Sequence, residues 1–251
     1  MTPNSSNLDF RTTHWSVIVS SRGSDNALRQ ASLTELYQQY WYPLFAYLRR
    51  KGHDVDQVSD YVQGFFAELI EKDFLKAVAP EKCRFRWFLM SAIGRYVSKQ
   101  LAGQRAQKRG GGATQFSLNA ESAEQRYQLE ISSQQGAENW TPERLFDRRW
   151  ALELLNLSLE QLRQDYEKRG KLHLYLALQH TLSGDSHGSD GTPTYAQIAQ
   201  TFQISESTIK VTVLRMRERY REVLCRNVAQ TVCDPESVGQ ELDELLSALR
   251  G

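Results

Sequence analysis

The most constraining feature of this 251-residue sequence is a run of helix-start and helix-stop signals that begins at Thr194. The segment reads TYAQIAQTFQISESTIKVTVLRMRERYREVL. Thr194 and Gln197 form a capping box, which predicts a short helix, and Ser205 is a good N-cap for a second, longer helix. The residues expected to face inward are Ile198, Ala199 and Phe202 in the first helix and Ile209, Val213, Met216 and Tyr220 in the second. The segment therefore predicts two helices joined by a tight turn that begins at Gln203.

The outer face of the longer helix is polar and cationic. Its residues are Glu206, Ser207, Thr208, Lys210, Val211, Arg215 and Arg217. A short helix, a tight turn and a longer helix with polar residues in its first turn is the geometry that places a recognition helix in the DNA major groove. We expect the first turn to contact base edges and the cations to contact phosphates. The alternative is a merely solvated face in a helical bundle, and Gln203 stands where glycine is common in such turns.

Helical periodicity also dominates the N-terminal half, so the sequence predicts an all-α protein. A first helix is expected over 32–51, with a kink or local break at Pro43 and a stop at Gly52. A second helix should start at Asp54 as N-cap and end near Ile70. A third pattern covers 84–107 and combines aromatic with basic residues.

Charge is segregated along a chain whose net charge is only +1. Residues 84–109 contain seven Lys or Arg and no Asp or Glu. Residues 234–250 reverse the sign, with five acidic residues against the single Arg250. A basic, aromatic segment is suited to a polyanionic partner, although a charged face is usually only solvated.

The remaining signals divide the chain into two helical domains. Residues 113–140 are rich in Ser, Gln, Glu and Ala, which favours a flexible linker. Thr141-Pro142-Glu143 is a helix-start signal, and Gly170 marks the end of that helix. A further helix over 171–182 precedes a polar loop over 183–192. The predicted organisation is a first domain at 12–109, a linker at 110–140, a second domain at 141–226 and an acidic helical tail at 227–251.

Composition and motifs argue against an enzyme. The cysteines are Cys83, Cys225 and Cys233, and the histidines are His14, His53, His173, His180 and His187. Neither set has metal-ligand spacing, and no nucleotide-binding loop or catalytic motif is present, so we expect no cofactor and no metal. No secretory signal or stretch of about 20 apolar residues is found, which predicts a cytoplasmic protein without a membrane partner.

Taken in order, the motifs resemble a known family. They are YWYPLFAYLRRKGHD, DQVSDYVQGFFAELIEKDF and CRFRWFLMSAIGRYVSKQL, followed by a linker and the helix-turn-helix. The chain is similar over about residues 12–226 to the two-domain sigma factors of the extracytoplasmic-function group in the sigma-70 family. The stretches WSVIVSSRG and QKRGGG resemble a subgroup typical of planctomycete-like bacteria.

The resemblance implies a transcription initiation factor that binds core RNA polymerase and promoter DNA. It implies that the second helix docks on the polymerase through Asp56, Gln57, Asp60, Gln63 and Phe66. An acidic and amide-rich face suits a basic partner, although without the resemblance a solvated face would be the better interpretation.

The third helix resembles the family's element for promoter melting and minus-ten recognition. The implied DNA contacts are Arg95, Tyr96, Lys99 and Arg105, with the connection from Asp73 to Cys83 capturing a flipped base. Basic side chains neutralise the strand and aromatic rings stack on unpaired bases. The helix-turn-helix then contacts the minus-thirty-five element through Glu206, Ser207, Thr208, Lys210 and Arg215.

Two other functions remain open at this stage. The chain could be a helix-turn-helix regulator that never enters the polymerase, or a helical adaptor that binds partners through the Asp60 face and the acidic tail. The tail itself could cap a domain, bind an anti-sigma factor or other regulator, or screen the basic surfaces in an autoinhibited state.

Overall fold

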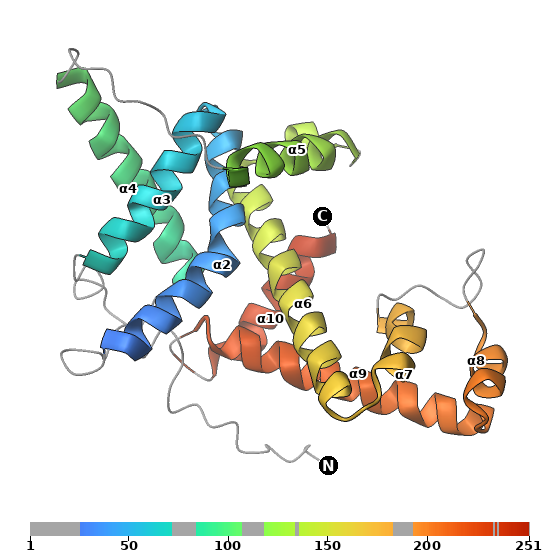
Figure 1. Cartoon of the computed structure of the whole chain (residues 1–251). Helices are drawn as coiled ribbons and strands as arrows, with labels where there is room; N and C mark the ends of the chain where they lie inside the picture. The colour runs from blue at the N-terminus through green and yellow to red at the C-terminus, as the bar shows by residue number, and fades with distance from the viewer. Residues whose placement is uncertain are drawn as a thin grey trace. The chain divides into compact units, whose positions relative to one another are not determined.

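The structure is a computed structural model, and it describes residues 26–71, 84–106, 118–133, 136–182, 193–232, 234 and 236–250. Over these residues the chain forms α-helices, two short 3₁₀ helices and no strand, which confirms the all-α prediction (Figure 1). The α-helices are α2 (Asn26–Arg50), α3 (Val55–Glu71), α4 (Phe85–Ala106), α5 (Leu118–Ser133), α6 (Pro142–Lys168), α7 (Leu172–Leu178), α8 (Tyr195–Phe202), α9 (Glu206–Ala229) and α10 (Ser237–Arg250). The 3₁₀ helices are η3 (Ala137–Asn139) and η4 (Gln179–Leu182).

Some predicted features lie outside the described residues. They are the N-terminal stretch at 15–23, the connection at 73–83, the glycine-rich stretch at 107–112 and the polar loop at 183–192.

The chain divides into two compact units. Unit 1 comprises Met1–Glu153 together with Val228–Gly251, and unit 2 comprises Leu154–Asn227. The division falls inside α6 and near the end of α9. Unit 1 thus contains the C-terminal tail as well as the N-terminal helices, whereas unit 2 contains the helix-turn-helix.

The turn between α2 and α3 follows from Gly52 and Asp54. The amide of Gly52 donates to the Arg49 carbonyl at 3.0 Å, and that of His53 donates to the Leu48 carbonyl at 3.3 Å. These two bonds form a Schellman motif, in which Gly52 takes the left-handed conformation at φ 88° that glycine tolerates best. Asp54 accepts from the amide of Val55 at 3.0 Å as α3 starts. The sequence predicted a kink or local break at Pro43, and the structure has no break there, because α2 continues through this residue.

Aromatic side chains from distant parts of the chain form the core of unit 1. Tyr40 is fully buried, with ring centroids 5.1 Å from Phe85 and 6.5 Å from Phe146. Its hydroxyl accepts a 3.1 Å hydrogen bond from Nε1 of the buried Trp150. Such pairs add specific geometry to the apolar area that they bury, so they fix α2, α4 and the first turns of α6 in one arrangement.

The helix α5 lies in the segment that was predicted to be a flexible linker. Its buried residues are Ala120, Ala123 and Tyr127, and it packs on α2 and α3. Glu124 accepts two 2.7 Å hydrogen bonds from Arg49, and Glu130 accepts one of 2.6 Å from the Tyr42 hydroxyl. A Ser- and Glu-rich segment is ordered here because its polar groups have partners 75 and 88 residues away along the chain.

Candidate nucleic-acid interface

The helix-turn-helix of unit 2 is built as its capping residues predict. The Thr194 side chain accepts from the Gln197 amide at 3.3 Å, and the Gln197 side chain accepts from the Thr194 amide at 2.8 Å, which completes the capping box of α8. Ser205 caps α9 by accepting from the Thr208 amide at 3.1 Å. Gln203 lies between the two helices at φ 54° and ψ 40°, in the left-handed region where glycine is favoured.

One apolar cluster holds α8 and α9 against the rest of unit 2. The buried members are Leu162, Tyr175, Leu178, Ile198, Ala199, Ile209, Val213 and Met216. Tyr220 and Phe202 pack against this cluster, so the inward faces of both helices are confirmed. Because α9 buries one side here, its opposite side is free to contact a ligand.

All five predicted minus-thirty-five contacts are exposed on α9. They are Glu206, Ser207, Thr208, Lys210 and Arg215. The hydroxyl oxygens of Ser207 and Thr208 each lie 2.7 Å from the Ser205 hydroxyl oxygen, and Lys210 pairs with Glu206 at 2.8 Å. Among the described residues Arg215 makes no ion pair, so its guanidinium is available to an anion without breaking an existing pair.

A second set of predicted contacts lies in unit 1, where α3 and α4 pack together. Arg95 and Lys99 are exposed, and Lys99 pairs with Glu68 at 3.3 Å. Tyr96 lies partly buried between them, and its ring packs edge-on against Phe65 with centroids 5.9 Å apart. Arg105 belongs to α4, but its side chain lies outside the described part of the chain.

A pocket of about 120 Å³ lies beside Tyr96. Its lining residues are Phe65, Glu68, Leu69, Ala92, Arg95, Tyr96 and Lys99, which combine an apolar floor with a charged rim. Burial raises the pKa of the Tyr96 hydroxyl, and the neighbouring Glu68 carboxylate raises it further. A Cβ on Gly64 would lie 2.3 Å from the Tyr96 hydroxyl oxygen, so α3 carries glycine where this side chain crosses its backbone.

Four of the five residues predicted to form the polymerase face of α3 lie at the surface of the helix. Gln57, Asp60 and Gln63 are exposed and Asp56 is partly exposed. Phe66 instead belongs to the core: it is 2% exposed and packs edge-on against Tyr37 at 5.0 Å. In this structure Phe66 supports the face from beneath and does not form part of it.

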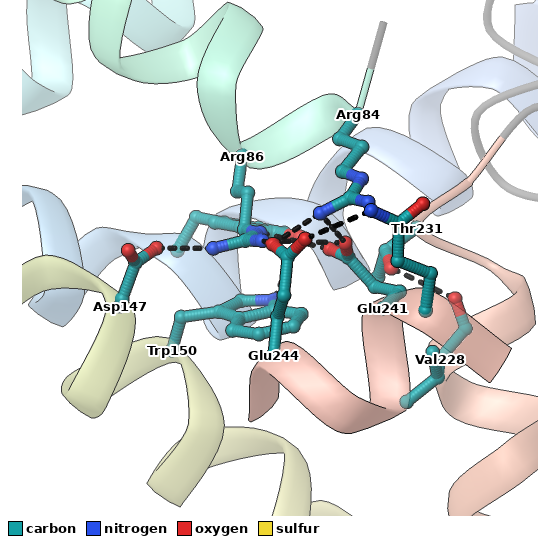
Figure 2. A network of polar contacts seen from close by, with 10 residues as sticks. Arg84, Arg86, Asp147, Trp150, Val228, Thr231, Glu241 and Glu244 are labelled. Atoms are coloured by element: carbon teal, nitrogen blue, oxygen red, sulfur yellow. Dashed lines mark hydrogen bonds and ion pairs between the residues drawn. The ribbon is translucent and has the colours of Figure 1, made fainter. Parts of the chain in front are cut away.

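The first turn of α4 carries an ion-pair cluster that sequence reasoning did not identify (Figure 2). Arg86 is 2% exposed, and its guanidinium pairs with Glu241 at 2.9 Å and also with Asp147 and Glu244. Arg84 pairs with Glu241 at 3.2 Å and with Glu244. The cluster ties together α4, α6 and α10.

Trp150 completes this cluster, and the guanidinium of Arg86 lies 4.7 Å from the centre of its ring (Figure 2). Burial raises the pKa of Glu241, although the two guanidiniums oppose the shift. The segregated charges of the sequence were the signal for this contact, but they did not indicate which acidic residue meets which arginine.

The tail helix α10 is therefore an integral part of unit 1. Glu241 and Leu245 are fully buried, and the backbone before α10 is also engaged, since Thr231 accepts from the Phe85 amide at 3.2 Å. Of the roles considered for the tail, capping a domain has contacts in the structure, and the acidic side chains of the tail also pair with two residues of the basic segment, Arg84 and Arg86. The predicted DNA contacts Arg95 and Lys99 are exposed in the presence of α10.

Comparison with protein-family models, with curated proteins and with solved structures finds no match to this chain. Over the described residues, no group of three or more His, Cys, Asp or Glu side chains is placed to hold a metal ion. No helix in that part of the chain has the length and apolar character needed to cross a membrane.

Proposed function

We propose that this chain is a sigma factor of the extracytoplasmic-function type, which binds core RNA polymerase and directs it to promoters. The observation that carries the proposal is the presence of two different polar surfaces in one chain. A helix-turn-helix with an exposed, polar first turn lies in unit 2, and an acidic and amide-rich helix beside a basic, aromatic helix lies in unit 1. A regulator that only bound DNA would need the first surface but not the second.

In this proposal unit 1 has two tasks. The polar side chains of α3 at Asp56, Gln57, Asp60 and Gln63 bind a basic element of the polymerase, because complementary charge orients the partners and disfavours incorrect ones. Arg95, Tyr96 and Lys99 of α4 bind the opened promoter strand, with cations on the phosphates and an aromatic ring against an unpaired base.

Unit 2 supplies a duplex contact upstream. The N-terminal turn of α9 enters the major groove, and Arg215 contacts the phosphate backbone. Because each neutralised phosphate releases counterions, duplex binding should weaken steeply with added salt. A helical adaptor that binds only proteins would not show this dependence.

The experiment is a binding assay with purified core polymerase and the double variant Asp60→Ala, Gln63→Ala. Both side chains are exposed, so folding should be unaffected, and affinity for core should fall about tenfold or more, or about 1.4 kcal/mol. The matched control is the double variant Gln164→Ala, Glu167→Ala on the exposed surface of α6. It also removes one amide and one carboxylate that are three positions apart in the sequence. This control should bind core like the wild type.

Duplex binding separates the alternatives in the same preparation. Both double variants should bind duplex DNA as the wild type does. A wild-type chain that binds duplex DNA but never core polymerase would be a helix-turn-helix regulator, and the sigma-factor proposal would then be wrong.

A further inference from the structure

The recognition helix α9 has an exposed stripe along the middle of its outer face, with two apolar residues at its centre. Ser207, Val211, Leu214 and Glu218 follow one another at spacings of four, three and four, so they lie on one line along the helix. Val211 is 47% exposed and Leu214 is 58% exposed. The buried line of Ile209, Val213, Met216 and Tyr220 has the same spacing on the opposite side, so neither apolar residue is needed for the core.

Cations lie on both flanks of this stripe. One flank carries Lys210, Arg217 and Arg221, which share a line at spacings of seven and four and are all exposed. Arg217 also donates to the Thr181 carbonyl at 2.9 Å, which fixes its side chain beside the helix.

The other flank extends beyond α9. Arg215 lines a hollow of about 370 Å³ together with Arg169 and Lys171, which come from the connection between α6 and α7. The remaining lining residues are Tyr166, Leu174, Thr212, Glu218, Arg219 and Glu222. Within it Arg219 pairs with Asp165 at 2.8 Å and with Glu222 at 2.9 Å. In the described chain Arg169, Lys171 and Arg215 have no ion-pair partner, so three cations on this flank are available to an anion.

Two cationic flanks with an apolar centre match the major groove of duplex DNA. A helix lying in that groove has a phosphate strand on each side and base edges in front of it. Among the groups that base pairs present there, the C5-methyl of thymine is the apolar one. A protein partner that matched the apolar centre of the stripe alone would not require cations on both sides.

We propose that Val211 and Leu214 recognise thymine C5-methyl groups, while the two cationic flanks hold the opposite phosphate strands. This inference rests on the proposed duplex binding by α9. Three residues along a helix correspond to a rise of about 4.5 Å, slightly more than the 3.4 Å between base pairs. The two side chains therefore contact thymines in neighbouring base steps.

The test uses the full-length protein and duplexes that it selects from a random-sequence pool. Each thymine of a selected duplex is replaced in turn by deoxyuridine, which lacks only the methyl group, and Kd is measured by fluorescence anisotropy. We expect a three- to fourfold loss of affinity at one or two neighbouring positions, equivalent to about 0.8 kcal/mol per methyl. Val211→Ala and Leu214→Ala should each abolish the effect of deoxyuridine at the thymine position that the replaced side chain contacts.

The matched control is Leu129→Ala, which shortens a leucine of 68% exposure on α5 in unit 1. It should retain the full sensitivity to deoxyuridine. The inference is overturned if no thymine position is sensitive, if sensitivity persists in both α9 variants, or if those variants bind DNA normally but lose a protein partner. These outcomes do not involve the polymerase, so they are distinct from failure of core binding, which would contradict the sigma-factor proposal alone.

Discussion

Replacing Gly64 with alanine tests the close packing of α3 against α4. Alanine is preferred to glycine inside a helix by about 1 kcal/mol, so the change alone should stabilise unit 1. The new Cβ would, however, lie 2.3 Å from the Tyr96 hydroxyl oxygen, which must then move by about 1 Å to reach ordinary contact. Moving the ring away from Phe65 forfeits about 0.5–1.5 kcal/mol of aromatic packing.

When Tyr96 is present, the gain in helix propensity and the loss of aromatic packing nearly cancel. Gly64→Ala should therefore change the free energy of unfolding by less than about 1 kcal/mol in either direction. In a Tyr96→Phe background the hydroxyl is absent and the nearest ring atom lies 3.4 Å away, so the same change should stabilise by about 1 kcal/mol. The coupling between the two sites is therefore about 1 kcal/mol.

Urea unfolding of the four proteins measures this coupling. The control is Gly94→Ala in α4, where no atom lies within 4 Å of the added Cβ, so its effect should be equal in both backgrounds. Equal effects of Gly64→Ala in the two backgrounds would show that the Tyr96 hydroxyl does not restrict this position, and would refute the predicted coupling.

Three further predictions concern the turn, the tail and α5. Gln203→Gly should raise the free energy of unfolding by about 0.5–1 kcal/mol, measured in urea, because Gln203 adopts a left-handed φ of 54° that glycine tolerates; a destabilised variant would contradict this. Glu241→Ala should cost about 2–3 kcal/mol, because it removes a buried partner of two guanidiniums, whereas the exposed Asp243→Ala should cost little; equal losses would contradict the integral role of α10. Burial raises the pKa of Glu124, but the hydrogen bonds from Arg49 and Gln128 and the charge of Arg49 together outweigh it, so the net pKa is lowered from 4.5. The stability advantage of the wild type over Glu124→Gln should therefore be full above pH 4.5 and shrink as the pH falls below it, and an advantage that grows in acid would contradict this.

Several helix ends were predictable from the sequence because they depend on local chemistry, although α2 begins at Asn26 and not at the predicted Ser32. The stops at Gly52 and Gly170, and the caps at Thr194 and Ser205, involve residues within a few positions of each other. The outer face of α9 was also predictable, because the spacing of its buried residues determines which residues are exposed.

The contacts that local chemistry could not predict are the long-range ones. The helix α5 buries two alanines and a tyrosine, which is a weak apolar pattern, and its order depends on partners such as Arg49 far along the chain. Arg86 and Glu241 are 155 residues apart, so segregated charge indicated their attraction but not their pairing. Phe66 was expected on the polymerase face because the resemblance placed it there, whereas packing against Tyr37 buries it.

The central proposal is tested most directly by transcription in vitro. Purified core polymerase is mixed with this protein and a library of linear promoter fragments, and the 5′ ends of the transcripts are sequenced. We predict transcripts that start at defined positions downstream of a shared pair of sequence elements, and that disappear with the Asp60→Ala, Gln63→Ala variant. Absence of promoter-specific transcripts, together with absence of a complex with core polymerase, would contradict the assignment.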